Sequence, residues 1–192
     1  MPVKRGERKL QILQTLAQML QNPRSEKITT AALAAKLNVS EAALYRHFAS
    51  KAQMFEGLIE FIEESIFGLI NKITTDEKSG MKQLEAMLTM LLGFAKTNPG
   101  MTRVLIGDAL VNENERLQTR INQLHDRLEA SIKQALRFAS SQNELPADVD
   151  AAARANLLMC YVTGRWHQYA KSGFKREPME HWTEQWRELI RT

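Results

Sequence analysis

Apolar residues recur at helical spacing along almost the whole chain of 192 residues. The clearest stretch lies within residues 113–139, where six aliphatic residues follow one another at intervals of three or four: Leu117, Ile121, Leu124, Leu128, Ile132 and Leu136. This spacing places them on one face of a helix, whereas a half-buried strand needs strict alternation. No segment of the sequence alternates in that way. The pattern predicts an all-α fold with about nine helices.

Proline, glycine and polar clusters interrupt this pattern at residues 22–23, 76–80, 98–100, 140–146 and 173–178. Proline lacks a backbone N–H and disfavours helix in the residue before it, so these clusters are expected to end helices. The expected helices cover residues 5–21, 31–37, 41–47, 51–75, 81–97, 113–139, 148–171 and 179–190, with a short one that begins at Pro99.

Residues 29–48 have the pattern of a helix-turn-helix. Thr29 or Thr30 is a suitable N-cap for the first short helix, and Ser40 for the second. Asn38 tolerates the left-handed backbone that the turn between them needs. Four apolar residues are spaced to form the core between the two helices: Leu33, Leu37, Val39 and Leu44. A short turn holds the second helix rigidly against the first.

The second short helix is expected to bind DNA. Its exposed face would present Glu41, Ala42, Tyr45 and Arg46, and the N-terminal end of such a helix enters the major groove. A carboxylate accepts from cytosine, a methyl group contacts thymine, and a guanidinium pairs with guanine or phosphate. The full set of expected DNA-binding residues is Thr29, Thr30, Ser40, Glu41, Ala42, Tyr45, Arg46, His47 and Lys51, with His47, Lys51 and the threonines assigned to phosphates.

Positive charge is concentrated at the N-terminal end. Residues 1–51 hold nine Lys/Arg and three Glu, a balance of +6, and the other 141 residues hold 17 basic and 19 acidic residues, a balance of −2. A basic arm of Lys4, Arg5, Arg8 and Lys9 precedes the helix-turn-helix. This asymmetry fits a polyanion-binding module joined to a nearly neutral body, although a solvated charged surface would have the same composition.

The string Leu-Tyr-Arg-His-Phe at residues 44–48, at the end of the second short helix, resembles the TetR family of DNA-binding regulators. The resemblance implies a three-helix DNA-binding head (residues 1–50) and an all-α dimerisation and partner or ligand domain (residues 51–192). It also implies a homodimer, whose two-fold symmetry would require a palindromic DNA site.

Further strings resemble a branch of this family that controls cell division. They lie at residues 28–30, 39–48, 54–55, 58–65, 98–105, 116–124 and 174–175. The resemblance implies that the protein binds palindromic chromosomal sites and, bound there, engages the C-terminal tail of the GTPase FtsZ. Ring assembly over the nucleoid is then blocked, an activity known as nucleoid occlusion.

The resemblance also implies a groove for the FtsZ tail beside the fourth, fifth and sixth helices. The matching positions are Phe61, Met90, Gly93 and Asn98. Two positions depart from the pattern, because Leu69 and Thr97 stand where arginines are implied. The loss of two cations is expected to weaken capture of an acidic tail.

The last two helices are expected to form the dimer interface. The helix at 148–171 is apolar around much of its circumference, which suggests burial on several sides. The expected interface residues are Leu158, Val162, Trp166, Trp182 and Trp186. Trp182 and Trp186 share one face of the last helix. This face suits a protomer core as well as a dimer interface, and a peptide-binding surface is the weaker alternative.

An alternative to division control is a ligand-responsive repressor with a small apolar effector. Five residues could line its cavity or simply form core: Phe67, Met87, Met90, Phe94 and Trp166. An enzyme is not expected, since the sequence has no glycine-rich phosphate loop, nucleophile elbow or metal-binding helix motif. We expect no metal and no cofactor.

The single cysteine, Cys160, lies in an apolar run and is expected to be inert core in a reducing cytoplasm. No apolar run reaches the length of about 18 residues that suggests a membrane span. The expected location is the cytoplasm, in association with the nucleoid.

Overall fold

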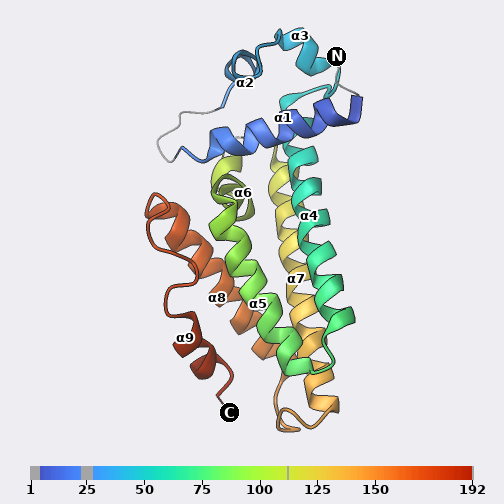
Figure 1. Ribbon diagram of the computed structural model, residues 1–192, viewed down its shortest axis with the longest axis vertical. Coiled ribbons are helices and arrows are strands. Elements are labelled where there is room, and N and C mark those ends of the chain that lie inside the picture. Colours follow the sequence, from blue (N-terminus) through green and yellow to red (C-terminus); the bar gives the residue numbers. More distant parts are fainter. Residues whose placement is uncertain (1–4, 23–27, 112, 192) are drawn as a thin grey trace. The chain divides into compact units, whose positions relative to one another are not determined.

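The computed structural model describes residues 5–22, 28–111 and 113–191, and within these ranges it contains helices and no strand. Figure 1 shows the helices, which are α1 (Arg5–Leu20), α2 (Thr30–Lys36), α3 (Glu41–Tyr45), α4 (Lys51–Asp76), α5 (Gly80–Thr97), α6 (Pro99–Leu105), the 3-10 turn η1 (Asp108–Leu110), α7 (Glu115–Ser141), α8 (Ala151–Lys171) and α9 (Trp182–Leu189). The all-α prediction is confirmed.

Two helices begin three residues later than the sequence predicts, for identifiable reasons. α8 begins after Asp150, whose carboxylate accepts hydrogen bonds from the N–H groups of Ala152 and Ala153 and so caps the helix. α9 begins after His181, which has a left-handed backbone (φ 62°) that breaks the helical path at residue 181.

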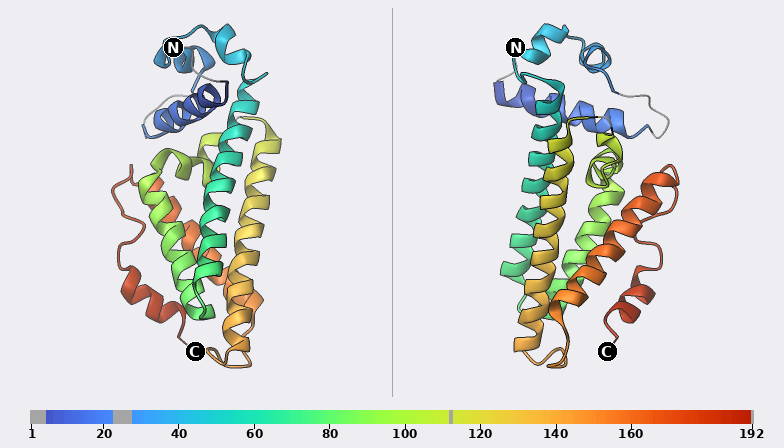
Figure 2. Two further views of the ribbon diagram at one scale, coloured as in Figure 1. Left: turned by 45° about the vertical axis from the view of Figure 1, so that its right-hand side comes forward. Right: turned by 180° about the vertical axis from the view of Figure 1, so that it is seen from behind.

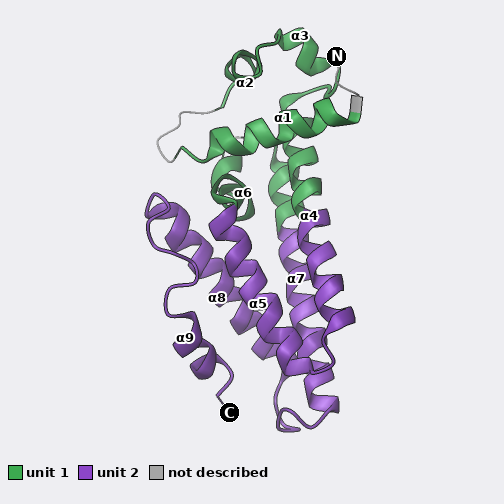
Figure 3. Cartoon of the chain, viewed as in Figure 1, with its two compact units in different colours: residues 1–62, 98–121 green, residues 63–97, 122–192 purple. Residues whose placement is uncertain are grey.

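The chain forms two compact units, coloured separately in Figure 3. Unit 1 comprises residues 1–62 and 98–121, and unit 2 comprises residues 63–97 and 122–192. Two long helices, α4 and α7, each contribute one section to each unit. This division follows packing within the chain, so the functional boundary expected at residue 50 stays a prediction.

Unit 1 contains the helix-turn-helix. Asn38 has the left-handed backbone predicted for the turn, with a φ of 54°. The side chains of Thr29 and Ser40 cap α2 and α3 by accepting from the N–H groups of Ala32 and Ala43. The fully buried side chains that hold the unit together include Ile12, Leu16, Leu33, Leu44, Met54, Phe55, Leu58, Ile59 and Ile62.

Within unit 1, α6 is fixed against the end of α1. The guanidinium of Arg103 donates to the carbonyl oxygens of Leu20 and Asn22, at 3.3 Å each. The same guanidinium pairs with Asp108 at 2.7 Å. Carbonyl groups at the end of a helix have no partner within the helix, and Arg103 supplies one from α6.

Unit 2 is a bundle formed by α5, α8, α9 and the sections of α4 and α7 that belong to it (Figure 2). Trp166 is fully buried, and its indole N–H donates to the carbonyl oxygen of Leu91 at 3.1 Å. Trp182 donates to the hydroxyl of Thr89 at 3.0 Å, which ties α9 to α5. Both indoles thus bury their apolar bodies and keep the hydrogen bond that their N–H groups need.

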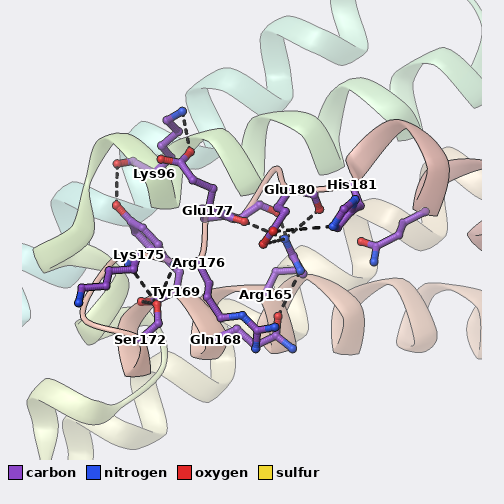
Figure 4. Close-up of polar contacts among 12 residues, drawn as sticks. Lys96, Arg165, Gln168, Tyr169, Ser172, Lys175, Arg176, Glu177, Glu180 and His181 are labelled. Atoms are coloured by element: carbon purple, nitrogen blue, oxygen red, sulfur yellow. Dashed lines mark hydrogen bonds and ion pairs between the residues drawn. The ribbon is translucent and has the colours of Figure 1, made fainter.

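The connection between α8 and α9 is held by Arg165 (Figure 4). Its guanidinium donates to three carbonyl oxygens, those of Glu177 (2.7 Å), Pro178 (3.0 Å) and Glu180 (2.9 Å). Lys96 forms an ion pair with Glu177 at 2.6 Å. One residue of α8 therefore fixes the path of the segment that leads into α9.

No helix in residues 5–22, 28–111 or 113–191 is both long and apolar enough to cross a membrane.

Candidate nucleic-acid interface and partner groove

The surface of α3 carries the side chains that the sequence assigns to base recognition. Glu41, Ala42, Tyr45 and Arg46 are all exposed, and Tyr45 is 46% exposed despite its aromatic ring. Leu44, on the opposite face, is buried in the core of unit 1. The short helix is therefore supported from one side and presents four exposed side chains of different chemistry on the other.

The residues at the N-terminal ends of α2 and α3 also contact one another. The hydroxyl of Thr30 donates to the carboxylate of Glu41, which links the start of one helix to the start of the next. The hydroxyls of Thr29 and Ser40 serve as caps. Binding of a phosphate there would have to use the remaining hydrogen-bonding capacity of these hydroxyls and the neighbouring N–H groups.

Lys51 and His47 lie at the joint between the helix-turn-helix and α4, and both are partly buried. The ammonium group of Lys51 is paired with the carboxylate of Glu113, whose side chain is 10% exposed. Lys51 also lies over the ring of Phe55. The Nδ1 of His47 is buried and has no hydrogen-bond partner among the described residues. Contact between Lys51 and a phosphate would share or replace its pair with Glu113.

The basic arm is described in part. Lys4 and the side chain of Arg5 lie outside the described residues. Arg8 donates to the side-chain oxygen of Gln11 at 2.8 Å, and the ammonium of Lys9 lies 5.5 Å from the centre of the Phe48 ring.

A groove of about 430 Å³ opens on unit 1. Its lining residues are Gln14, Ala17, Gln18, Gln21, Phe61, Asn98, Gly100 and Met101. Two of the four residues expected in the partner groove, Phe61 and Asn98, are thus brought together at one depression. The other two, Met90 and Gly93, belong to α5 in unit 2, where both are half-buried.

Both positions that depart from the expected arginines are at the surface. Leu69 is 44% exposed on α4. Thr97 ends α5, and its hydroxyl donates to the carbonyl oxygens of Gly93 and Phe94, at 3.1 Å each. Neither side chain is charged, so neither can form an ion pair with an anionic partner.

Three of the five residues expected at the dimer interface have no exposed surface in the protomer, and for these three the expectation needs correction. Leu158, Val162 and Trp166 are 0% exposed, and Trp182 and Trp186 are buried against α5 and α8. A side chain without exposed surface has none left for a second protomer. The apolar character of α8 on several sides reflects packing against α5, α7 and α9 within one chain.

The outward face of α8 differs from the expected one. The exposed residues at helical spacing along it are Ala153, Leu157, Cys160, Gly164, His167 and Lys171, and we call this set the α8 stripe. Leu157 is 52% exposed. Cys160 is exposed as well, so the expectation that it forms inert core is wrong. An apolar run in a sequence does not reveal which of its members face outward.

One cavity among the described residues of unit 2 is too small for an apolar effector. The cavity lined by Met81, Leu84, Leu136, Leu145, Val149, Arg154, Leu158 and Ile190 holds about 10 Å³. That is roughly the space of one water molecule, far below the roughly 300 Å³ of a small ligand pocket. Met87 and Trp166, two of the residues considered for an effector cavity, are fully packed.

A helix-turn-helix with an exposed recognition helix in unit 1, in a chain whose unit 2 is a helical bundle, defines a DNA-binding regulator. Comparison with known families agrees with this class. Residues 26–58 match the profile of bacterial regulatory proteins of the tetR family, and residues 78–192 match the profile of a tetracyclin repressor-like C-terminal domain of SlmA type.

Relatives of the whole chain narrow the class. The chain is 51% identical to the nucleoid occlusion factor SlmA of Alteromonas mediterranea, over 96% of this chain and 94% of that protein. It is 53% identical to the protein of the same name from Shewanella putrefaciens, over 94% and 91%. The chain belongs to the TetR family of DNA-binding regulators and, within it, to the SlmA nucleoid occlusion factors.

Solved structures support the same fold. A TetR transcription regulator from Haloarcula marismortui superposes with a TM-score of 0.82, over 96% of this chain and 97% of that chain, at 17% identity. At that identity the likeness concerns the fold alone. By its family, the protein is a TetR-type, DNA-binding homodimer and a regulator. The same family membership confirms the prediction that it is not an enzyme.

Sequence reasoning missed two features of unit 1. Gln14 and Gln18 of α1, with Gln21 directly after it, line the groove, and no role was expected for them. The pair between Lys51 and Glu113 joins residues 62 positions apart. A signal for the first was present, because Gln14, Gln18 and Gln21 repeat at intervals of four and three on one side of the helix.

Proposed function

We propose that the protein binds palindromic sites on chromosomal DNA as a dimer and that, bound there, it inhibits assembly of the FtsZ ring. It would act in the cytoplasm, on the nucleoid. The observation that carries the proposal is that one compact unit holds both the exposed recognition residues of α3 and the groove that contains Phe61 and Asn98. A protein with a DNA-binding surface and a partner-binding surface on the same unit can hold the partner at the DNA site.

The DNA contacts follow from the exposed chemistry of α3. We assign Glu41, Ala42 and Arg46, which are all exposed, to base edges, and Tyr45 with the N-terminal ends of α2 and α3 to phosphates. The symmetry of a homodimer requires two equivalent half-sites, so the proposed site is a palindrome.

The dimer itself is proposed to form along the α8 stripe. Its six residues are exposed in the protomer, share one side of the helix, and include an exposed leucine and small residues that allow close approach. A second copy related by two-fold symmetry would bury this face in an arrangement of two helices from each protomer.

The FtsZ step is tested with a labelled FtsZ tail peptide titrated into DNA-bound protein, followed by fluorescence anisotropy. We expect saturable binding at tens of micromolar. Phe61→Ala should weaken binding by about tenfold or more, because a buried aromatic side chain stabilises a complex by about 1.5–3 kcal/mol. Glu60→Ala, an exposed neighbour on α4, is the matched control and should bind as the unaltered protein does.

Absence of saturable peptide binding, with DNA binding intact, would contradict the FtsZ role and leave a transcriptional repressor. Loss of preference for palindromic over scrambled duplex would contradict the DNA role. The two parts of the proposal therefore fail separately.

A further inference from the structure

One side of the unit 1 groove is formed by glutamines from α1, the first helix of the DNA-binding head. Gln14 and Gln18 belong to α1, and Gln21 directly follows it. All three are exposed, and their side-chain amides make no hydrogen bond within the described part of the chain. We call these three residues the glutamine face. Three amides that line one depression can offer donors and acceptors to whatever occupies it.

The rest of the described lining gives the groove a definite chemical character. Phe61, Met101 and Ala17 supply apolar surface, and Asn98 supplies a fourth side-chain amide. Among the described lining residues none is ionisable. An apolar surface bordered by amides matches a peptide main chain that carries an apolar side chain, since each amide offers both a donor and an acceptor to backbone C=O and N–H groups.

The walls of the groove are held in place before anything binds. A Cβ on Gly100 would overlap the carbonyl oxygen of Ala17, so α1 and α6 touch backbone to backbone at the groove. Arg103 of α6 holds the carbonyl oxygens of Leu20 and Asn22 at the end of α1. A preformed wall reduces the ordering cost of binding.

We propose that the glutamine face binds the main chain of an extended peptide segment by amide hydrogen bonds, while an apolar side chain of that peptide packs on Phe61 and Met101. The inference rests on the proposed function, because the peptide is the partner tail assigned to this groove. The inference adds the glutamine face to the residues that determine specificity for the peptide. Capture by amides and apolar contact does not depend on charge, which suits a chain with Leu69 and Thr97 where cations were expected.

The decisive variant is the double substitution Gln14→Leu with Gln18→Leu, which keeps side-chain size and removes both amides. Binding of the labelled tail peptide to DNA-bound protein should weaken about fivefold or more, given the usual contribution of two hydrogen bonds. Gln123→Leu with Gln134→Leu on α7 is the matched control, because both side chains are exposed and lie outside the lining. Circular dichroism and DNA affinity should be unchanged in all three proteins.

A second measurement tests the independence from charge. The dissociation constant for the peptide should change less than about threefold between low and moderate salt, because no ion pair within the groove is screened. Gln18→Glu should weaken binding of an acidic tail and make the affinity depend on salt.

The outcomes separate this inference from the proposed function. If the unaltered protein does not bind the peptide, both fail. If it binds and Phe61→Ala loses binding, but the variant without the amides of Gln14 and Gln18 binds as tightly as the α7 control, only the role of the glutamine face is overturned. A steep loss of affinity with salt in the unaltered protein would overturn the capture by amides and assign it to charged residues elsewhere.

Discussion

Gly100 at the start of α6 lies directly against the main-chain carbonyl of Ala17 in α1, with no space for a Cβ between them. This approach joins the DNA-binding head to the helix that borders the groove, within one compact unit. We expect Gly100→Ala to destabilise the protein by about 1–3 kcal/mol, because the cost of overpacking exceeds the 0.5–1 kcal/mol that alanine gains over glycine in a helix. Thermal unfolding should shift down by about 2–12 °C.

Gly68→Ala is the matched control for this substitution. Gly68 lies within α4, and a Cβ there would meet nothing within 4 Å. Only the propensity gain remains, so this variant should unfold at the same or a slightly higher temperature. Equal behaviour of the two variants would show that α1 and α6 can separate at little cost.

Lys51 and Arg46 are expected to contribute to the protein in different ways. Arg46 is exposed on α3, so Arg46→Ala should leave the melting temperature unchanged and reduce the preference for palindromic over scrambled duplex, because its guanidinium is proposed to read a base edge. Lys51→Met should lower the melting temperature without DNA, because the carboxylate of Glu113 would remain mostly buried without its cation.

The double variant Lys51→Met with Glu113→Gln provides the control for that ion pair. Removal of both charges should restore most of the stability that the single variant loses. An unchanged melting temperature in Lys51→Met would contradict a structural role of Lys51 and would restrict its role to DNA binding. The measurements are thermal melts and anisotropy titrations with palindromic and scrambled duplex.

The sequence predicts local features of this fold well because their causes are local. Helix ends follow from Pro99, Asn38 and the capping hydroxyls of Thr29 and Ser40, each within four residues of the bond or turn it controls. The outward face of α3 follows from the same logic, since burial of Leu44 places its neighbours at the surface. These expectations needed no knowledge of distant contacts.

Features that depend on contacts distant in the sequence were predicted poorly. The packing of α5 and α9 decides whether an apolar residue of α8 faces its own bundle or a partner. The sequence of α8 alone does not contain this information. The pattern therefore predicts Trp166 at the dimer interface and Cys160 in the core, whereas Trp166 is buried and Cys160 is exposed. The groove arises where α1, α4 and α6 meet, and no local pattern reports that meeting. Polar glutamines acquire a role there only because Gly100 lets the helices approach.

The α8 stripe leads to a prediction about assembly. Leu157→Glu should shift the protein from dimer toward monomer, because two-fold symmetry would place a carboxylate from each protomer in the seam. Sedimentation velocity measures the change. Leu69→Glu is the matched control, an identical substitution at a leucine of similar exposure on α4, and should remain dimeric.

Oxidative cross-linking tests the same surface independently. Cys160 is the single cysteine of the chain and lies in the α8 stripe, so a covalent dimer can form only through this residue. Mild oxidation should trap the dimer of the unaltered protein and not that of Cys160→Ser. If Leu157→Glu stays dimeric and the unaltered protein does not cross-link, the dimer interface lies outside the α8 stripe.

Acid sensitivity should arise at two helix N-termini in unit 2. Hydrogen bonds from Ser79 and from the N–H of Met81 hold the pKa of Glu144 below its ordinary value of 4.5. The N–H groups of Ala153 and Ala152 lower the pKa of Asp150 in the same way. A lowered pKa means that the ionised form stabilises the fold above the ordinary value and that this stability is lost as pH falls through the folded value.

The melting temperature should therefore be nearly flat between pH 7 and about pH 5 and should fall at lower pH. Glu144→Gln with Asp150→Asn should melt lower at pH 7 and show a shallower decline in acid, because the carboxylates responsible are gone while asparagine still caps α8. Glu85→Gln, at an exposed position on α5, serves as control and should follow the unaltered protein. Parallel curves for the double variant and the unaltered protein would mean that other groups control acid unfolding.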